Sequence, residues 1–332
     1  MNPHCDGVFW NPATTGFFYL IQSFMSEIRL PEVELNIYNK NNPAEATVAE
    51  NYIVTKESSP NFIRHMSFDI SGTDLLGRVK VGQSIGVLPP GEDEKGRAHK
   101  LRLYSVSSPG KGEHGKPHLI STTVKRTIEE IEDNRLYLGI CSNYLADLKV
   151  GDKVRLTGPS GKRFLLPLNQ EDYNYVFFAT GTGIAPFRGM LMELFEGDYK
   201  NDAALVFGCP YRTDLLYADY FQDLQQKSSN FRYMTCISRE SRRADGSKYY
   251  VQTVLQDRSD DLLPILQKEN TLIYICGLKG MQVGIYHALA KLGLNEYLIV
   301  KDPLTSIDPE KWAYKDISKS IKPSARTFEE VY

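Results

Sequence analysis

The chain has 332 residues, of which 42% are hydrophobic and 24% charged, and 39 Lys and Arg against 41 Asp and Glu give a formal net charge of −2. This length allows one large or two ordinary domains, and the balanced charge argues against non-specific nucleic-acid binding. Five cysteines lie far apart without a CxxC pair. They favour a reducing compartment and argue against a zinc site, an iron–sulfur cluster or a secreted disulfide framework, so no metal is expected.

Residues 1–32 are expected to form an N-terminal extension that is disordered. Residues 16–25, GFFYLIQSFM, form an apolar run. The run is too short to span a bilayer. It lacks a basic region before it and an A-x-A site after it, so it does not indicate a signal peptide. Met25 is an alternative start of the protein.

Residues 33–167 are predicted to form an antiparallel β-barrel. Turn signals such as Pro89-Pro90-Gly91 separate six short segments rich in strand-forming residues. These segments are ATVAENYIVT (46–55), IRHMSFDI (63–70), QSIGVLP (83–89), RLYSVSS (102–108), LISTTVKR (119–126) and KVRLTGP (153–159). Short strands at this spacing are typical of an antiparallel barrel.

Residues 168–332 are predicted to form a doubly wound α/β domain. YNYVFFAT (173–180) is almost continuously apolar, as expected of a buried parallel strand, and FRGMLMELFE (187–196) follows at helical spacing. The alternation continues to TLIYICG (271–277) and GMQVGIYHALAKLG (280–293). Such an alternation predicts a parallel sheet. The sequence therefore predicts two domains with a boundary near residue 167.

The segment ATGTGIAPFRG (179–189) joins the first predicted strand of this domain to its helix. Gly181 and Gly183 would let a diphosphate approach the backbone, and the helix N-terminus would face the anion. The motif is not a complete GxGxxG, since Pro186 stands at the position of the third glycine. A tight turn between a strand and a helix that binds no ligand would show the same pattern.

Ligands of open parallel sheets bind at the carboxyl ends of the strands. Those ends carry Thr180, Gly181, Gly183, Cys209, Pro210, Ser238, Arg239, Cys276 and Gly277. Lys248 and Tyr250 follow Arg239 and add a charge and an aromatic ring. This set suits a 2′-phosphate and an adenine, and so favours NADP(H) over NAD(H), although a solvated patch would look similar.

Nine strings of the chain together resemble the plant-type ferredoxin–NADP(+) reductase family. They are HKLRLYSVSS (99–108), TVKR (123–126), GICSNYLADLKVGDKV (139–154), TGPSGKRFLLP (157–167), ATGTGIAPFRG (179–189), ISRE (237–240), KYYVQ (248–252), YICGLKGM (274–281) and EEVY (329–332). They run in the family's order over residues 44–332. The resemblance implies an FAD-binding antiparallel barrel followed by an NADP-binding α/β domain.

The resemblance also implies residues that bind FAD. Tyr104 would lie flat on the isoalloxazine, Arg102 would pair with the diphosphate, and Ser105 would sit near the reactive flavin nitrogen. The other implied FAD residues are Leu103, Thr123, Val124, Lys125, Gly139, Ile140, Cys141, Ser142, Thr180 and Tyr332.

The NADP residues implied in the same way lie mainly in the second domain. They are Lys125, Thr180, Gly181, Gly183, Cys209, Pro210, Ser238, Arg239, Lys248, Tyr250, Gln252, Gly277, Leu278 and Glu330. The implied catalytic residues are Ser105, Cys276, Glu330 and Tyr332. Cys276 would pack beside the nicotinamide, Glu330 would influence charge at the flavin edge, and Tyr332 would cover the flavin until nicotinamide displaces it.

The chain departs from the family at two places. Glu129 stands where many members have the tyrosine that stacks on the FAD adenine, so stacking must come from elsewhere. Residues 294–326 are unlike the usual short ending, and Thr327 and Glu329 replace an aromatic and an apolar residue. This second difference could alter how Tyr332 reaches the flavin.

The implied function is that of an FAD-dependent oxidoreductase that exchanges a hydride with NADP(H) and single electrons with ferredoxin or flavodoxin. Alternatives are the reductase component of an oxygenase, similar to benzoyl-CoA epoxidase reductases, a diaphorase or flavin reductase, and a redox-inert binding module. Basic candidates for carrier docking are Lys95, Arg97, Lys100, Lys111, Lys116, Lys162 and Arg163. We expect a monomer, not integral to a membrane, in the bacterial cytoplasm or, in a eukaryote, the plastid stroma.

Overall fold

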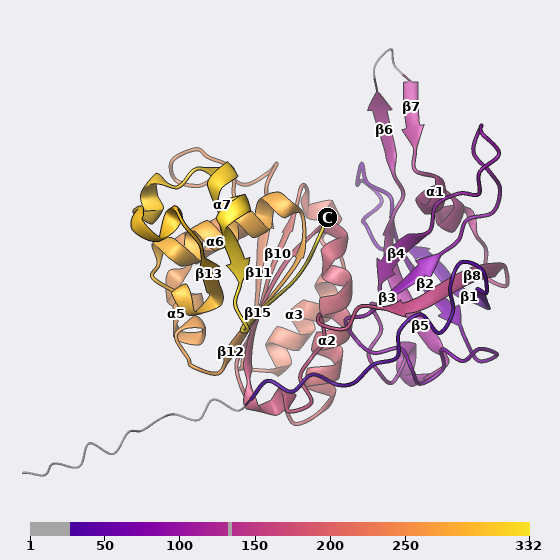
Figure 1. The fold of residues 1–332 in the computed structure, drawn as a ribbon, viewed down its shortest axis with the longest axis horizontal. Coiled ribbons are helices and arrows are strands. Elements are labelled where there is room, and N and C mark those ends of the chain that lie inside the picture. Colours follow the sequence, from indigo (N-terminus) through magenta and orange to yellow (C-terminus); the bar gives the residue numbers. More distant parts are fainter. Residues whose placement is uncertain (1–26, 132–134) are drawn as a thin grey trace, which may run out of the picture.

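The structure, a computed structural model, describes residues 27–131 and 135–332. Two bodies lie side by side, an antiparallel β-barrel and a parallel sheet covered by helices, and the C-terminus lies on the side of the parallel sheet that faces the barrel (Figure 1). The predicted fold class is therefore confirmed.

The barrel is built from six antiparallel strands in the order β4-β3-β8-β1-β2-β5. Their bounds are Ala44–Ile53 (β1), Ile63–Asp69 (β2), Ser84–Val87 (β3), Arg102–Ser105 (β4), Leu119–Lys125 (β5) and Lys153–Ser160 (β8). A bridge between Val106 and Thr122 brings the two edges of the sheet together and closes it. Met66 and Phe68 are fully buried inside, and helix α1 (Ile140–Asp147) packs against β5.

A two-stranded hairpin projects from the barrel (Figure 1). It consists of β6 (Ile128–Ile131) and β7 (Arg135–Leu138), and its side chains are exposed. Glu129 pairs with Tyr137 across the two strands. Directly paired residues lie on the same face of an antiparallel ladder, so Glu129 and Tyr137 share a face.

The second domain holds a five-stranded parallel sheet in the order β11-β10-β9-β12-β15. Its strands are Asn174–Thr180 (β9), Ala203–Cys209 (β10), Phe231–Ile237 (β11), Thr271–Gly277 (β12) and Thr327–Val331 (β15). The helices around it are Ile184–Glu196 (α2), Ala218–Lys227 (α3), Val254–Asp257 (α4), Ser259–Leu266 (α5) and Lys279–Lys291 (α6). Alternate residues of β9 enter opposite cores: Phe177 packs with α2 and α3, and Phe178 with α4, α5 and α6.

Residues 294–326 form a small layer between α6 and β15. It contains β13 (Leu298–Val300), α7 (Tyr314–Ser320) and β14 (Ile321–Pro323), and its Trp312 and Ile317 join the core beneath α6. This layer accounts for the unusual length of the chain before β15.

Short 3-10 helices complete the fold at Glu113–Gly115, Gln170–Asp172, Gly181–Gly183, Arg212–Asp214, Val251–Thr253, Asn295–Tyr297, Leu304–Ser306 and Pro309–Lys311.

The connection between the domains runs from Ser160 to Asn174, so the boundary predicted near residue 167 falls within it.

Most of the predicted N-terminal extension, residues 1–26, lies outside the described residues. The backbone of Arg29 accepts a hydrogen bond from Leu168 at 2.7 Å, and Ile28 and Leu30 pack against the core around α2. In residues 27–131 and 135–332, no helix has the length and apolar character needed to cross a membrane.

Helix α2 approaches the barrel closely because Gly189 lacks a side chain. A Cβ at Gly189 would lie 2.6 Å from the carbonyl oxygen of Ser108. Such a contact is too short for any real Cβ atom, so the backbone of one domain would have to move away from the other.

We predict that Gly189→Ala lowers the free energy of unfolding by roughly 1–2 kcal/mol, although alanine is the better helix former. Gly197→Ala is the matched control, because its Cβ would meet the Leu194 carbonyl at an ordinary 3.6 Å. Urea unfolding of both variants checks this. A Gly189→Ala protein as stable as the control would contradict it.

Candidate functional site

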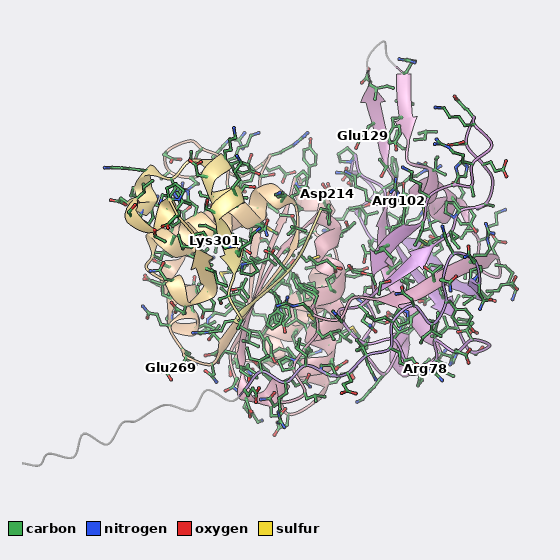
Figure 2. The ribbon with its side chains drawn as sticks, viewed as in Figure 1. Arg78, Arg102, Glu129, Asp214, Glu269 and Lys301 are labelled. Carbon is green, nitrogen blue, oxygen red and sulfur yellow. The ribbon has the colours of Figure 1, made fainter. Side chains whose placement is uncertain are left out.

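A cavity of about 1810 Å³ lies between the barrel and the α/β domain. Figure 2 places Arg102 and Glu129 on the barrel side of it and Asp214 on the opposite side. Its walls include these residues expected from the sequence: Arg102, Leu103, Tyr104, Ser105, Thr123, Lys125, Gly139, Ile140, Cys141, Ser142, Thr180, Gly181, Gly183, Cys209, Pro210, Ser238, Tyr250, Gln252, Cys276, Leu278, Glu330 and Tyr332. Segments that are more than 200 residues apart in the chain thus share one site.

Four expected residues do not line the cavity. Val124 is 1% exposed in the barrel core, because alternate residues of β5 face opposite ways and Thr123 and Lys125 take the cavity side. Gly277 is buried against Thr180. Arg239 and Lys248 lie on the exposed loop after β11. There Arg239 donates to the Tyr211 hydroxyl at 2.9 Å, and the backbone of Lys248 forms a β-bridge with that of Arg242.

The barrel wall combines an aromatic ring with positive charge. Tyr104 is partly buried, and this burial raises the pKa of its hydroxyl well above the ordinary value of 10.0, which keeps it neutral. Arg102 and Lys125 are exposed on the same wall, and within the described residues neither forms an ion pair. The N-terminus of α1 opens beside them, and its first amides have no partner inside the helix. This donor set suits a ligand with an aromatic ring and a diphosphate.

Sequence reasoning missed several residues of the barrel wall. Tyr137 lines the cavity and is 49% exposed. The loop after β3 adds Asp93, Arg97, Ala98, His99 and Lys100, of which Arg97 and Lys100 were expected only as residues for carrier docking. The alternation of Leu136 and Leu138 in RLYL could have revealed the second strand of the hairpin, because it has the period of a strand, whereas IEEI does not alternate. The loop carries no comparable signal.

The opposite wall is centred between β9 and β12, where the strand order of the parallel sheet reverses. The chain is packed very closely here: a Cβ at Gly183 would lie 2.2 Å from the Cys276 carbonyl oxygen, and one at Gly277 2.2 Å from the Thr180 hydroxyl. The Leu278 amide donates to that hydroxyl at 3.0 Å. The glycines therefore let the Gly-rich turn pack directly against the end of β12. Such a crossing point is the usual ligand crevice of a doubly wound sheet.

Glu330 connects the two walls. The Ser105 hydroxyl donates to one of its carboxylate oxygens at 3.2 Å, and the Ser84 hydroxyl to the other at 3.5 Å. Ser84 and Ser105 are register partners in the barrel, and Cys276 and Glu330 are partners in the parallel sheet. Strand register thus brings the carboxylate to both serines. Burial raises the pKa of Glu330, and the two hydroxyls oppose that shift only in part.

Cys276 is 3% exposed, and its burial raises the pKa of the thiol far above its ordinary value of 9.0, with the charge of Glu330 adding to the effect. Cys141, on the barrel wall, is shifted in the same direction by burial. Reactive cysteines need a thiolate, so these two act here as neutral, apolar side chains.

Tyr332 ends the chain inside the site. Its amide donates to the Gly277 carbonyl at 3.0 Å, and the Lys279 amide donates to the Tyr332 carbonyl at 3.2 Å. Its hydroxyl lies 3.1 Å from that of Thr182, while the residue as a whole remains 65% exposed. The terminal ring is therefore held against the Gly-rich turn by a few polar contacts.

Comparisons with known proteins agree with this arrangement. Residues 177–286 match the family model described as oxidoreductase NAD-binding domain. The chain is 42% identical over 275 residues to a ferredoxin–NADP reductase of Picosynechococcus, a match that covers 79% of this chain and 68% of that protein. It is 38% identical over 305 residues to the chloroplastic leaf isozyme 1 of Oryza sativa subsp. indica, covering 89% and 79%. A structure of ferredoxin–NADP+ reductase from Plasmodium falciparum superposes with a TM-score of 0.66 at 25% identity, covering 90% of this chain and 99% of that one.

The chain belongs to the ferredoxin–NADP reductase family. The resemblance drawn from the nine sequence strings is thereby confirmed.

The raised pKa of Glu330 gives a pH-dependent prediction. Because the folded state holds this proton more tightly than the unfolded state, the stabilising contribution is present below the ordinary pKa of 4.5 and is lost as the pH rises through the folded value. Glu330→Gln removes that loss. The variant should therefore gain stability over the parent at about pH 7 but not at about pH 4, as measured by urea unfolding. If the stability of Glu330→Gln differed from that of the parent by the same amount at both pH values, the raised pKa of Glu330 would be contradicted.

Proposed function

We propose that the protein is an FAD-dependent oxidoreductase that exchanges a hydride with NADP(H) and single electrons with ferredoxin or flavodoxin. The observation that carries this proposal is the single cavity walled on one side by Tyr104, Arg102 and α1, and on the other by the Gly-rich turn and the ends of β9 and β12. Both nucleotides would meet there. The names of the relatives support the same activity.

The residues present fit FAD. Tyr104 would contact the flavin ring, and Arg102 with the N-terminus of α1 would hold the diphosphate. Gly139 leaves room for this wall to form, because a Cβ there would lie 2.7 Å from the Ser142 hydroxyl and 2.8 Å from the Thr127 Cβ. Bound FAD would supply the exchange of a hydride with NADP(H) and of single electrons with the carrier.

The residues present also fit NADP(H). Gly181 and Gly183 would bring backbone amides to the nucleotide, and Lys125 would place a positive charge opposite them. Ser238 and Tyr250 lie on the cavity wall near the ends of the neighbouring strands. Arg239 and Lys248, just outside, would serve the 2′-phosphate from the exposed loop.

Ser105, Glu330 and Tyr332 would lie beside the reacting edge of the flavin. Ser105 donates to Glu330, which has a raised pKa, so this pair can hold a proton beside the cavity. Tyr332 occupies the position at the Gly-rich turn from which the nicotinamide would displace it. Displacement would be easy because the ring is bound by few contacts.

The carrier and the compartment are further parts of the proposal. An acidic carrier would dock on a basic face, and of the candidate residues Lys100 and Arg97 lie on the rim of the cavity, although Arg97 is paired with Asp93 at 2.6 Å. The protein would act as a monomer in the bacterial cytoplasm or, in a eukaryote, in the plastid stroma. Light scattering of the purified protein would test the monomer.

Anaerobic stopped-flow reduction tests the proposed activity. We expect bound FAD to be bleached by NADPH much faster than by NADH, and the reduced protein to be reoxidised by ferredoxin or flavodoxin at a rate that falls with salt. Protein without FAD, or FAD that NADPH does not reduce, would contradict the proposal. Reduction without reoxidation by either carrier would instead favour an oxygenase reductase or a diaphorase.

Tyr137 gives a separate prediction for FAD binding. Its ring shares the cavity-facing side of the hairpin with Glu129, whereas the exposed Leu136 lies on the other side. We expect Tyr137 to contact the adenine of FAD, so that Tyr137→Ala raises the dissociation constant for FAD about three- to ten-fold. Leu136→Ala is the matched control and should leave it unchanged. Fluorescence titration of cofactor-stripped protein with FAD measures both, and equal constants would refute the contact.

A further inference from the structure

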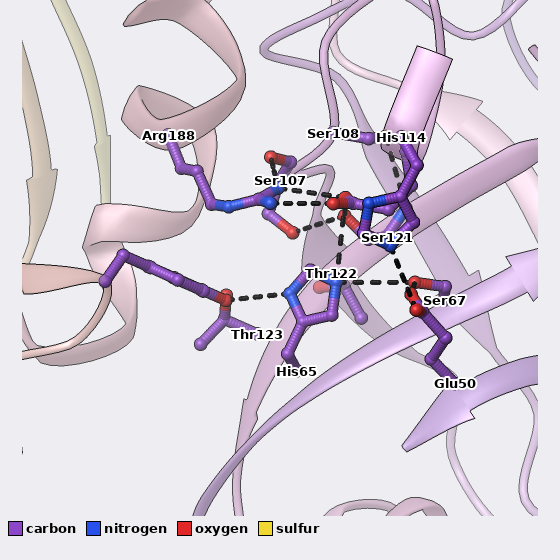
Figure 3. Close-up of polar contacts among 12 residues, drawn as sticks. Glu50, His65, Ser67, Ser107, Ser108, His114, Ser121, Thr122, Thr123 and Arg188 are labelled. Atoms are coloured by element: carbon purple, nitrogen blue, oxygen red, sulfur yellow. Dashed lines mark hydrogen bonds and ion pairs between the residues drawn. The ribbon is translucent and has the colours of Figure 1, made fainter. Parts of the chain in front are cut away.

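A buried polar cluster joins the barrel to the α/β domain. We define it as His65, Glu113 and Thr123 of the barrel with Arg188 and Tyr217 of the α/β domain. Figure 3 shows Arg188 extending from its helix towards the barrel, with His65 and Thr123 nearby and dashed contacts among these groups. Apart from Thr123, these residues belong to none of the cofactor sets above.

Arg188 provides the first connection. Its guanidinium donates to both oxygens of Glu113, at 2.7 and 2.9 Å, and to the Ser107 carbonyl at 2.9 Å. The Arg188 side chain is 11% exposed and that of Glu113 1%. A two-pronged ion pair of this kind fixes direction as well as distance. Gly189, next in the helix, permits the close approach that the pair requires.

Tyr217 provides the second connection. Its hydroxyl lies 3.0 Å from Nδ1 of His65 and 2.7 Å from the Thr123 hydroxyl. Its ring lies 5.0 Å below the Arg188 guanidinium. Tyr217 has a φ of 55°, which is unfavourable for a bulky residue and persists only where surrounding contacts hold it.

The charges of the cluster are fixed near neutral pH. Although burial works against it, the hydrogen bonds and charge of Arg188 hold the pKa of Glu113 below its ordinary range. Burial and the neighbouring Arg188 lower the pKa of His65 to about 4, against the opposing charges of Glu113 and Glu50. The cluster thus contains one ion pair surrounded by neutral groups. Removing one partner would leave a buried charge unmatched.

The cluster leads directly to the cavity on both sides. Thr123 and Lys125 of the same strand line the cavity wall. On the other domain, the segment from Cys209 to Tyr217 starts at the cavity wall and ends in the cluster. Midway, Asp214 accepts hydrogen bonds from Ser59 and from Asn61, the latter at 2.9 Å. The segment that would contact NADP(H) is therefore attached to the barrel side at both Asp214 and Tyr217.

We propose that Arg188 and Tyr217 are positioning residues that set the orientation of the two domains during hydride transfer. The inference rests on the proposed function. The nicotinamide would be held by one domain and the flavin by the other, so the distance between the reacting atoms depends on contacts between the domains. Reacting atoms must approach to about 3–3.5 Å, and a misplacement of about 1 Å costs on the order of 100-fold in rate.

Tyr217→Phe is the first test variant, because it removes one hydroxyl and keeps the ring beside Arg188. Arg188→Gln is the second. The matched control is Tyr199→Phe, which removes a buried hydroxyl that donates to the Tyr173 carbonyl at 2.8 Å within the α/β domain. All three are prepared with FAD bound. Stopped-flow reduction by NADPH and by NADPH deuterated at C4 gives the hydride-transfer rate and its isotope effect, and difference spectra give the dissociation constant for NADP+.

We expect both test variants to transfer hydride roughly ten-fold or more slowly than the parent at saturating NADPH, with a larger isotope effect. Their FAD content and NADP+ dissociation constants should change less than about two-fold, because the nucleotide contacts lie elsewhere. Small-angle scattering of Arg188→Gln should show a broader distribution of distances. Tyr199→Phe should match the parent in every measurement.

Unchanged hydride transfer in both variants would overturn the inference while leaving the proposed function intact. So would an equal loss in Tyr199→Phe, which would show general destabilisation. A loss matched by weaker NADP+ binding would assign the residues to binding and likewise overturn a positioning role. A parent protein that holds FAD but is not reduced by NADPH would overturn the proposed function first, and the inference with it.

Discussion

The contact between the barrel and the α/β domain is the constraint on which the site depends. Neither domain alone has the cavity, because Tyr104 and Ser105 come from one and Cys276 and Glu330 from the other. The interactions that hold the walls together include the buried ion pair of Arg188 and Glu113 and the contact of Glu330 with the barrel serines. A buried ion pair adds little net stability, but its geometry is specific, which suits a role in orientation.

Strand register explains how distant segments deliver their side chains to the same point. The β3–β4 pairing sets Ser84 beside Ser105, and the β12–β15 pairing sets Glu330 beside Cys276. A slip by one residue in either sheet would turn these side chains to the opposite face. The same register positions the end of the chain, because the Tyr332 amide continues the ladder with a hydrogen bond to the Gly277 carbonyl.

The added layer of residues 294–326 leaves this geometry intact. Arg326 donates to the Thr271 carbonyl at 3.0 Å and lies 4.5 Å from the ring of Tyr297, so the layer is fastened where β15 begins. Further along, Glu329 accepts hydrogen bonds from Gln282 and Tyr286 of α6. Polar contacts thus replace the apolar ones expected at this position, and β15 still enters the sheet beside β12.

Local patterns were enough to predict the fold and the Gly-rich turn, whereas most of the cavity wall was predicted through the family resemblance. Apolar runs and Gly-rich turns are set by neighbours in the sequence, which is why the barrel, the doubly wound sheet and the turn at Gly181 were predictable. Val124 was placed in the site because a motif was taken as a block, whereas strand alternation turns it into the core. Tyr137 was missed because its position depends on pairing across a hairpin. The Arg188 cluster was missed because it exists only once two domains dock.

The central claim is that one cofactor cavity is shared by both domains and closed by the end of the chain. Hydrogen exchange measured with and without bound FAD tests it most directly. The account predicts that FAD slows exchange in peptides of β4 and α1 and also in the C-terminal peptide that holds Glu330 and Tyr332. Slower exchange confined to the barrel, with the C-terminal peptide unchanged, would contradict it.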